Sequence, residues 1–233
     1  MFGIKTRLQR FYRTKKSIGK NYSILRDEYG QWNSFWNSKC LDKDGNFVPW
    51  FTYPAIEYIK QLDLSDKRVL EYGSGFSTMF WAKRTKSVVS IEDDKAWYEK
   101  LKPQLPANVN YIHVNNEQEY VGAVAKLEGQ FDIIINDGIY RLSCAKASRP
   151  KLADGGIVIL DNSDWCAQAC AYYRDSDLIE VDMAGFTPLN AYPMTTSFFF
   201  SRSVKLKPAH DHQPVLAVGG QHISEDDLSL VRG

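Results

Sequence analysis

A short apolar strand that runs into an acid and two glycines constrains the fold of this chain most. Residues 69–70 lead to Glu71, and Gly73 and Gly75 follow with one residue between them. Glycine lets the backbone turn sharply and approach a ligand closely. The pattern becomes helical over residues 78–84, so the stretch predicts a strand, a tight turn and a helix. Such a unit is typical of the opening of a nucleotide-binding α/β fold.

The acid distinguishes this turn from a dinucleotide-binding fingerprint. That fingerprint carries Gly or Ala at the position of Thr78 and needs no acid at the position of Glu71. The pattern of an acid and two alternating glycines instead resembles motif I of the class I S-adenosylmethionine (SAM) methyltransferases. The resemblance implies that Glu71 helps to order the amino-acid end of SAM. It also implies cofactor contacts for the turn residues Gly73, Ser74, Gly75 and Ser77, the last of which can cap the helix.

A second β-branched run, residues 87–91, ends in Glu92, Asp93 and Asp94. A strand-end carboxylate about 20 residues after the glycines suits a ribose diol, because one carboxylate accepts both hydroxyl protons. We predict that Glu92 binds the ribose of SAM and that Asp93 lies beside it at the cofactor. The alternative for these acids is capping of the next predicted helix, residues 95–101.

Residues 109–114 form the third predicted strand, and Asn115, Asn116 and Glu117 follow it. In the methyltransferases that the chain resembles, the loop after this strand often contacts the adenine, which implies Asn115 as a cofactor residue. His113 lies inside an apolar alternation, which is typical of a core histidine.

The remaining strands complete a prediction of the fold. Phe131–Asn136 is almost continuously apolar, as in a strand buried on both faces of a parallel sheet, and Ile157–Leu160 is the next strand. The last two strands, Leu178–Val181 and Ser197–Ser201, have no helix between them, which fits the antiparallel seventh strand of the SAM methyltransferase sheet. We predict an α/β fold with a Rossmann-like, doubly wound, mostly parallel seven-stranded sheet and an antiparallel last strand.

Polar residues follow the fourth and fifth strands. Asp137 comes after the fourth strand, and Asp161 and Asn162 come after the fifth. Their oxygens suit Mg²⁺, Mn²⁺ or Ca²⁺. The stretches Phe131–Asp137 and Gly155–Asn162 resemble the cation-dependent O-methyltransferases of the catechol and caffeoyl-CoA type, which implies that these three residues bind a metal. The alternative is a set of strand-end side chains that cap the next turns, with Asp161 lining the SAM pocket.

The chain departs from that family at the position of the general base. The family commonly has a lysine three residues after the first metal ligand, whereas this chain has Tyr140 and then Arg141. With a metal, the acceptor hydroxyl would be acidified by the ion; without one, Asp137, Asp161 or Tyr140 would orient or deprotonate it. Arg141 either holds a carboxylate or phosphate of the acceptor or forms a salt bridge on a helix surface.

A length of 233 residues suits one domain with appendages. We divide the chain into a basic segment with an aromatic cap (1–49), a SAM-binding methyltransferase domain (50–203) and a C-terminal tail (204–233). Trp50 and Phe51 come just before motif I, where aromatic residues of this family often wall the SAM and acceptor pocket. Core packing is the alternative for both residues.

Charge is distributed unevenly. Residues 1–20 hold seven Lys and Arg and no acid, although the formal net charge of the chain is +1. Apolar residues among the basic ones predict a helix that rests on an anionic membrane surface; a solvated terminus, or one packed on the core, is the alternative. The sequence has no stripe of basic and aromatic residues of the kind that binds nucleic acid, so we expect no nucleic-acid partner. The four cysteines form no C-x-x-C pair, which indicates free thiols in the cytoplasm. A membrane that residues 1–20 contact would then present its cytoplasmic, inner face to the protein.

Together these features predict SAM-dependent methyl transfer to a hydroxyl group of a small-molecule or glycan acceptor, with Mg²⁺ or Mn²⁺ if the strand-end oxygens bind a metal. Two alternatives remain. One is an NAD-dependent reductase, and the other is a non-catalytic binding protein with a methyltransferase-like fold. The sequence leaves the acceptor and the oligomeric state open.

Overall fold

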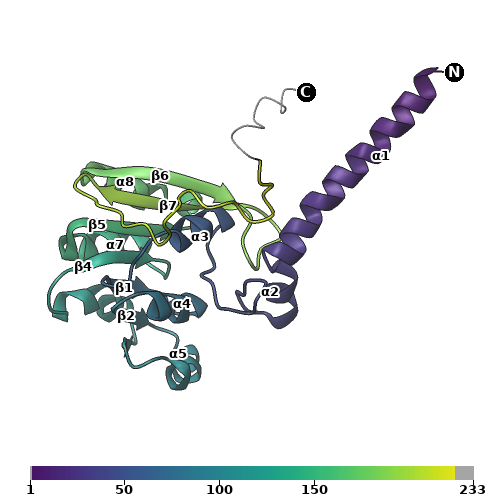
Figure 1. Cartoon of the computed structure of the whole chain (residues 1–233). Coiled ribbons are helices and arrows are strands. Elements are labelled where there is room, and N and C mark those ends of the chain that lie inside the picture. The colour runs from purple at the N-terminus through teal and green to yellow at the C-terminus, as the bar shows by residue number, and fades with distance from the viewer. Residues whose placement is uncertain (1, 224–233) are drawn as a thin grey trace.

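A seven-stranded sheet with helices on both faces forms the body of the protein (Figure 1). The computed structural model describes residues 2–223, of which residues 2–5 are described by their backbone only. The strands are β1 (Arg68–Tyr72), β2 (Ser87–Glu92), β3 (Val109–His113), β4 (Phe131–Asn136), β5 (Leu152–Asp161), β6 (Leu178–Gly185) and β7 (Met194–Ser201). Their order in the sheet is β3-β2-β1-β4-β5-β7-β6.

The strand directions confirm the predicted fold. The neighbouring pairs among β1 to β5 are parallel, and β7 runs antiparallel to both β5 and β6. The last two strands are longer than their apolar patterns predicted. Their pairing extends from Leu178 opposite Ser201 to Gly185 opposite Met194, because hydrogen bonding between strands recruits polar residues that carry no hydrophobic pattern.

The helices connect the strands and extend the chain before them. They are α1 (Phe2–Ser23), α2 (Gln31–Asn37), α3 (Tyr53–Lys60), α4 (Phe76–Arg84), α5 (Lys95–Leu101), α6 (Glu117–Gly122), α7 (Arg141–Ser148) and α8 (Ala167–Asp175). A single turn of π-helix, Ile24–Glu28, links α1 to α2.

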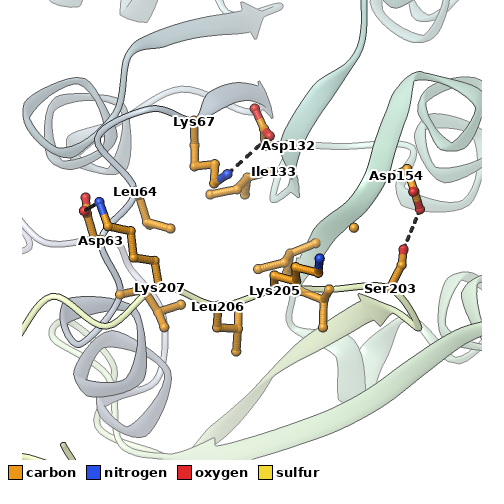
Figure 2. A pocket seen from close by; sticks show the side chains of 14 residues that line it. Asp63, Leu64, Lys67, Asp132, Ile133, Asp154, Ser203, Lys205, Leu206 and Lys207 are labelled. Carbon is orange, nitrogen blue, oxygen red and sulfur yellow. Dashed lines mark hydrogen bonds and ion pairs between the residues drawn. The ribbon is translucent and has the colours of Figure 1, made fainter.

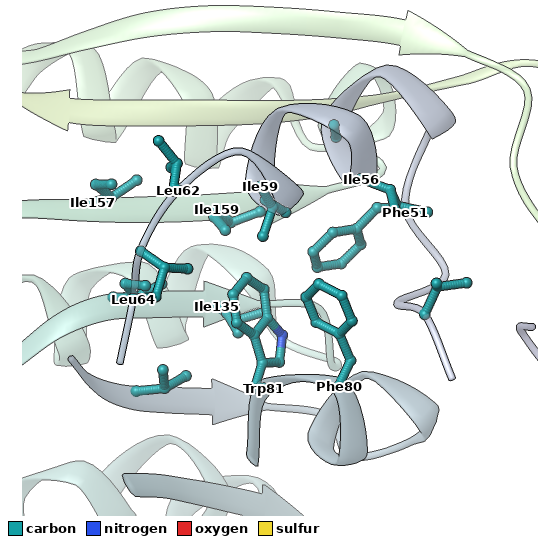
Figure 3. Close-up of a cluster of buried hydrophobic side chains, with 14 of the residues drawn as sticks. Phe51, Ile56, Ile59, Leu62, Leu64, Phe80, Trp81, Ile135, Ile157 and Ile159 are labelled. Carbon is teal, nitrogen blue, oxygen red and sulfur yellow. The ribbon is translucent and has the colours of Figure 1, made fainter. Parts of the chain in front are cut away.

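Apolar side chains fill both faces of the sheet. On one face, Ile59 of α3 and Trp81 of α4 are buried against Ile135 of β4 and Ile159 of β5 (Figure 3). Ile134 points to the other face, which explains why β4 reads as a continuous apolar run. The helices that cover this second face contribute Tyr120, Cys144 and Tyr173.

The two ends of the chain behave differently. α1 projects away from the body (Figure 1). After β7 the chain returns beside the turn that follows α3, where the amide of Asp63 donates to the carbonyl of Lys207 at 2.9 Å. Residues 224–233 of the predicted tail lie outside the described residues. None of the helices within residues 2–223 combines the length and the apolar character needed to cross a bilayer.

Candidate active site

A cavity of about 810 Å³ lies at the carboxyl ends of β1, β4 and β5. Segments distant in the sequence line it: the turn at 73–77, the strand-end residues 137 and 161–162, the segment 37–40 and residues of the loop before β7. Ligands of open α/β sheets bind at this edge.

A second cavity, of about 270 Å³, lies at the opposite edge of the sheet (Figure 2). Two ion pairs neutralise charge within it, Lys67 with Asp132 at 3.7 Å and Lys207 with Asp63. The first cavity is therefore the better candidate for a ligand site.

The glycine turn between β1 and α4 forms one wall of the first cavity. Gly73 has a φ of +84°, and a Cβ added there would lie 2.7 Å from the Cα of Gly138 and 2.9 Å from the carbonyl oxygen of Asp137. Glycine is therefore required for the close approach of the loop after β4. At Gly75 an added Cβ would meet no atom nearer than the Oγ of Ser77, at 3.9 Å, so a side chain there would fill cavity space.

Glu71 lies behind the turn and does not line the cavity. Its fully buried carboxyl group accepts hydrogen bonds from the hydroxyls of Ser77 at 2.6 Å, Thr78 at 2.5 Å and Ser90 at 2.7 Å. Burial raises the pKa of Glu71 to about 7, although these hydrogen bonds oppose the rise. Through these hydrogen bonds Glu71 connects the start of α4 to β2.

Glu92 lies at the end of β2 and connects to the turn through Ser74. The amide and the hydroxyl of Ser74 donate to its Oε2 at 3.1 and 2.5 Å. The amides of Asp93 and Asp94 donate to its Oε1 at 3.0 and 2.8 Å. The carboxylate is buried, and a ribose could reach it only if the Ser74 hydroxyl turned away.

Asp137, which was also predicted for the cofactor, lines the cavity, whereas Asp93 and Asn115 do not. Asp93 is exposed, and Asp94 caps α5 by accepting from the amide of Trp97 at 2.9 Å. Asn115 is exposed, and its amide donates to Glu119 at 3.0 Å. His113 is half-buried against the ring of Tyr98, with the ring centres 5.2 Å apart.

Arg141 ties together the ends of β4 and β5. Its Nη2 donates to the Oδ1 of Asp137 at 3.2 Å and to the Oδ1 of Asn162 at 3.1 Å. Its Nη1 donates to the carbonyls of Asn136 and Asp161, and its Nε donates to the carbonyl of Gly138. All five N–H groups of a guanidinium are thereby used, so Arg141 has none left for an acceptor.

The strand-end oxygens do not fit a divalent metal in this arrangement. One oxygen of Asp137 and the side-chain oxygen of Asn162 accept from Arg141, whose guanidinium keeps its positive charge at all accessible pH values and repels a divalent cation. The Oδ1 of Asp161 accepts instead from the hydroxyl of Thr196 at 2.5 Å. Within residues 2–223, no group of three or more His, Cys, Asp and Glu side chains is placed to hold a metal ion.

The two strand-end carboxyl groups have raised pKa values. Burial raises the pKa of Asp137 to about 6, although the neighbouring Arg141 opposes the rise. Burial and the charge of Asp137 raise the pKa of Asp161 well above its usual range. With a pKa of about 6, Asp137 is mostly ionised at neutral pH and carries its negative charge beside Arg141.

Tyr140 immediately precedes α7 in a left-handed conformation, with a φ of +52°, and does not line the cavity. Conversely, the cavity takes in residues that no sequence motif singled out, among them Lys39, Cys40, Lys100 and Asn190. They reach it from three different segments of the chain. Trp50 also lines the cavity, in the wall position that the resemblance implied, whereas Phe51 is buried in the core.

No protein-family model and no curated protein matches the sequence. Solved structures do match the fold. A protein described as an rRNA methylase from Clostridium thermocellum superposes with a TM-score of 0.50 at 11% identity, over 67% of this chain and 99% of that chain. The precorrin-6y C5,15-methyltransferase of Geobacter metallireducens has a TM-score of 0.49 at 15% identity, over 63% and 87% of the two chains.

A protein described as a caffeoyl-CoA O-methyltransferase from Staphylococcus aureus has a TM-score of 0.45 at 17% identity, over 58% of this chain and 76% of that chain. At such identities the similarity concerns the fold. The chain has the Rossmann-like fold found in SAM-dependent methyltransferases, as its glycine turn and its succession of strands and helices predicted.

Proposed function

We propose that this protein is a SAM-dependent methyltransferase that modifies a hydroxyl group of a small-molecule or glycan acceptor. The observation that carries the proposal is one cavity that joins the glycine turn at 73–77 to the carboxyl groups of Asp137 and Asp161. A cofactor wall and a proton-accepting group therefore share one space, as methyl transfer to oxygen requires.

The residues of the cavity fit SAM. The space at Gly75 admits a ligand against the backbone, and the volume of about 810 Å³ leaves room for an acceptor beside the cofactor. Glu92 would take the ribose hydroxyls after rotation of the Ser74 hydroxyl, which Tyr111 can still engage because its Oη lies 2.6 Å from the Ser74 Oγ. When bound, SAM supplies a methyl group on a positively charged sulfur.

The protein supplies alignment and a proton acceptor. Asp137 is ionised at neutral pH and has one oxygen that Arg141 does not engage, so it accepts the proton of the acceptor hydroxyl as the new C–O bond forms. Asp161 lines the same cavity beside Asp137, within reach of the same acceptor. Arg141 keeps both strand ends in place through its hydrogen bonds to Asp137, Asp161 and Asn162.

Aromatic residues at the cavity support an acceptor with rings. Phe47, Trp50, Trp165 and Tyr192 line it together with amide side chains such as Asn190. Aromatic faces stack on sugar or aromatic rings, and amide groups bind hydroxyls. Both features favour polyhydroxylated ring compounds over a flexible apolar acceptor.

Calorimetric titration with SAM, followed by transfer of labelled methyl groups to a panel of hydroxylated acceptors in EDTA, tests the proposal. We expect saturable SAM binding and labelled product with the chelator present. NADH binding without SAM binding would instead favour the reductase, and SAM binding without turnover on any acceptor would favour the binding protein.

A further inference from the structure

The projecting helix α1 exposes apolar side chains along its length. It spans Phe2–Ser23, about 33 Å at the usual rise per residue (Figure 1). The exposed fractions of Leu8, Phe11 and Ile18 are 53%, 61% and 62%. A helix whose apolar side chains stay exposed is only marginally stable in water, because most helical stability in proteins comes from burial of one face. A partner that covers this face would therefore stabilise α1.

The apolar residues form one arc of the helix. At 100° per residue, Leu8, Phe11, Ile18 and Tyr22 fall within about 80° of one another. Lys15 lies within the same arc, and its long side chain can extend its ammonium group past an apolar boundary. The rest of the circumference carries most of the positive charge, from Arg7, Arg10, Arg13, Lys16 and Lys20.

The charge of α1 identifies the class of partner. Residues 1–20 contain seven basic residues and no acid, whereas the remaining chain has 22 basic and 28 acidic residues, a difference of −6. A second copy of α1 would bring like charges together, and a nucleic acid would leave the apolar arc uncovered. We infer that α1 binds an anionic lipid surface, with its arc in the headgroup boundary and its basic residues at the lipid phosphates.

A second aromatic surface follows directly in the chain. Trp32 and Trp36 of α2 are exposed by 57% and 78%, and their rings stack with centres 6.3 Å apart. Tryptophan favours the membrane–water interface. The last residue of α2 and the three residues after it, 37–40, line the cavity, so α1 is connected to the cavity wall through the π-helical turn and α2. The inference about α1 does not depend on the reaction catalysed there.

Vesicle flotation of the full-length protein tests the inference. One set of vesicles contains phosphatidylcholine alone, and the other contains phosphatidylcholine with phosphatidylglycerol. We expect binding to the anionic vesicles only, with loss of binding at high salt. Replacing Leu8, Phe11 and Ile18 by serine should weaken binding by about 100-fold, because it removes three apolar side chains from the bilayer boundary.

A matched pair of charge variants gives the control. Arg10→Gln, Arg13→Gln and Lys20→Gln together should weaken binding by about 100-fold. The same number of substitutions on the exposed body, Lys126→Gln, Lys146→Gln and Lys205→Gln, should change it little. Three results would each overturn the inference. They are equal binding to both vesicle types, equal effects of the two charge variants, and absence of vesicle binding, including the case in which α1 instead mediates self-association or binds RNA.

Discussion

Arg141 stands among the oxygens at which a metal was predicted. Its Nη2 contacts the side chains of both Asp137 and Asn162, and its Nη1 contacts the carbonyl of Asp161. The guanidinium group of Arg141 thus lies where the family resemblance implied an exchangeable metal ion. It also joins two strand ends that a metal-dependent site would connect through the ion.

Removal of Arg141 tests this substitution of one cation by another. We expect no Mn²⁺ binding by the wild-type protein and a gain of Mn²⁺ binding in Arg141→Ala, because Asp137 and Asn162 then lose their cation. The spectrum of Mn²⁺ in electron paramagnetic resonance measures both. Arg141→Ala combined with Asp137→Asn is the control and should lose the gained site. Mn²⁺ binding by the wild type that depends on Asp137 would contradict the interpretation.

The ionisation of Asp137 sets a pH dependence for the proposed reaction. Its pKa is raised to about 6, and the ionised form accepts the proton, so the methyl-transfer rate should rise with pH through about 6. Asp137→Asn should lower the rate by about 100-fold or more and abolish this rise. Pre-steady-state rates across the pH range measure both effects. A wild-type rate that does not change between the two sides of this pH would exclude Asp137 as the base.

Glu71 makes stability depend on pH. Its pKa is raised from 4.5 to about 7, so the unfolded state ionises first and the protein loses stability as pH rises through this interval. Below it, both states are protonated and the contribution of Glu71 is fully present. We expect Glu71→Gln to remove a loss on the order of 3 kcal/mol. Urea unfolding of both proteins across this range measures the difference, which would be constant with pH if Glu71 were ionised throughout.

At the scale of elements, the turn between β1 and α4 separates two roles of glycine. Gly73 has a positive φ and touches the loop after β4, whereas Gly75 has an extended φ of 178° and faces open space. Gly73→Ala should therefore lower the free energy of unfolding by on the order of 2 kcal/mol. Gly75→Val should leave stability nearly unchanged and abolish SAM binding, because its side chain enters the cavity.

Urea unfolding and calorimetric SAM titration of the two glycine variants distinguish the roles. Each variant controls for the other, since both add a side chain to the same turn. Unchanged SAM affinity in a folded Gly75→Val protein would show that the cofactor does not lie against this part of the cavity.

At the scale of the whole molecule, the lipid-binding helix and the cavity are separate surfaces. Leu8, Phe11 and Ile18 do not line the cavity. We expect the serine variant of all three to keep its SAM dissociation constant within about twofold, since distant sites contribute independently. Calorimetry in the absence of lipid measures this. A larger change would mean that α1 influences the cavity.

The succession of strands and helices along the chain could be predicted from the sequence because its signals are local. Apolar runs of strand length, helical spacing after Gly75 and acids at strand ends each involve neighbouring residues. The same signals brought Asp137, Asp161 and Asn162 to one edge, since parallel strands end together. Local signals could not show that Thr78 and Ser90 donate to the carboxyl group of Glu71 together with Ser77.

Tertiary structure alone decided what these side chains contact. Arg141 is separated by about 20 residues from Asp161 and Asn162, and the sequence allowed it to hold an acceptor or to lie on a surface. Because β4 packs beside β5, the hydrogen-bond partners of Arg141 all surround its guanidinium group. The fold, and the presence of Asp137 and Asp161 at one edge of the sheet, follow from local sequence patterns. The position of Arg141 between these acids follows from the way β4, β5 and α7 meet in space.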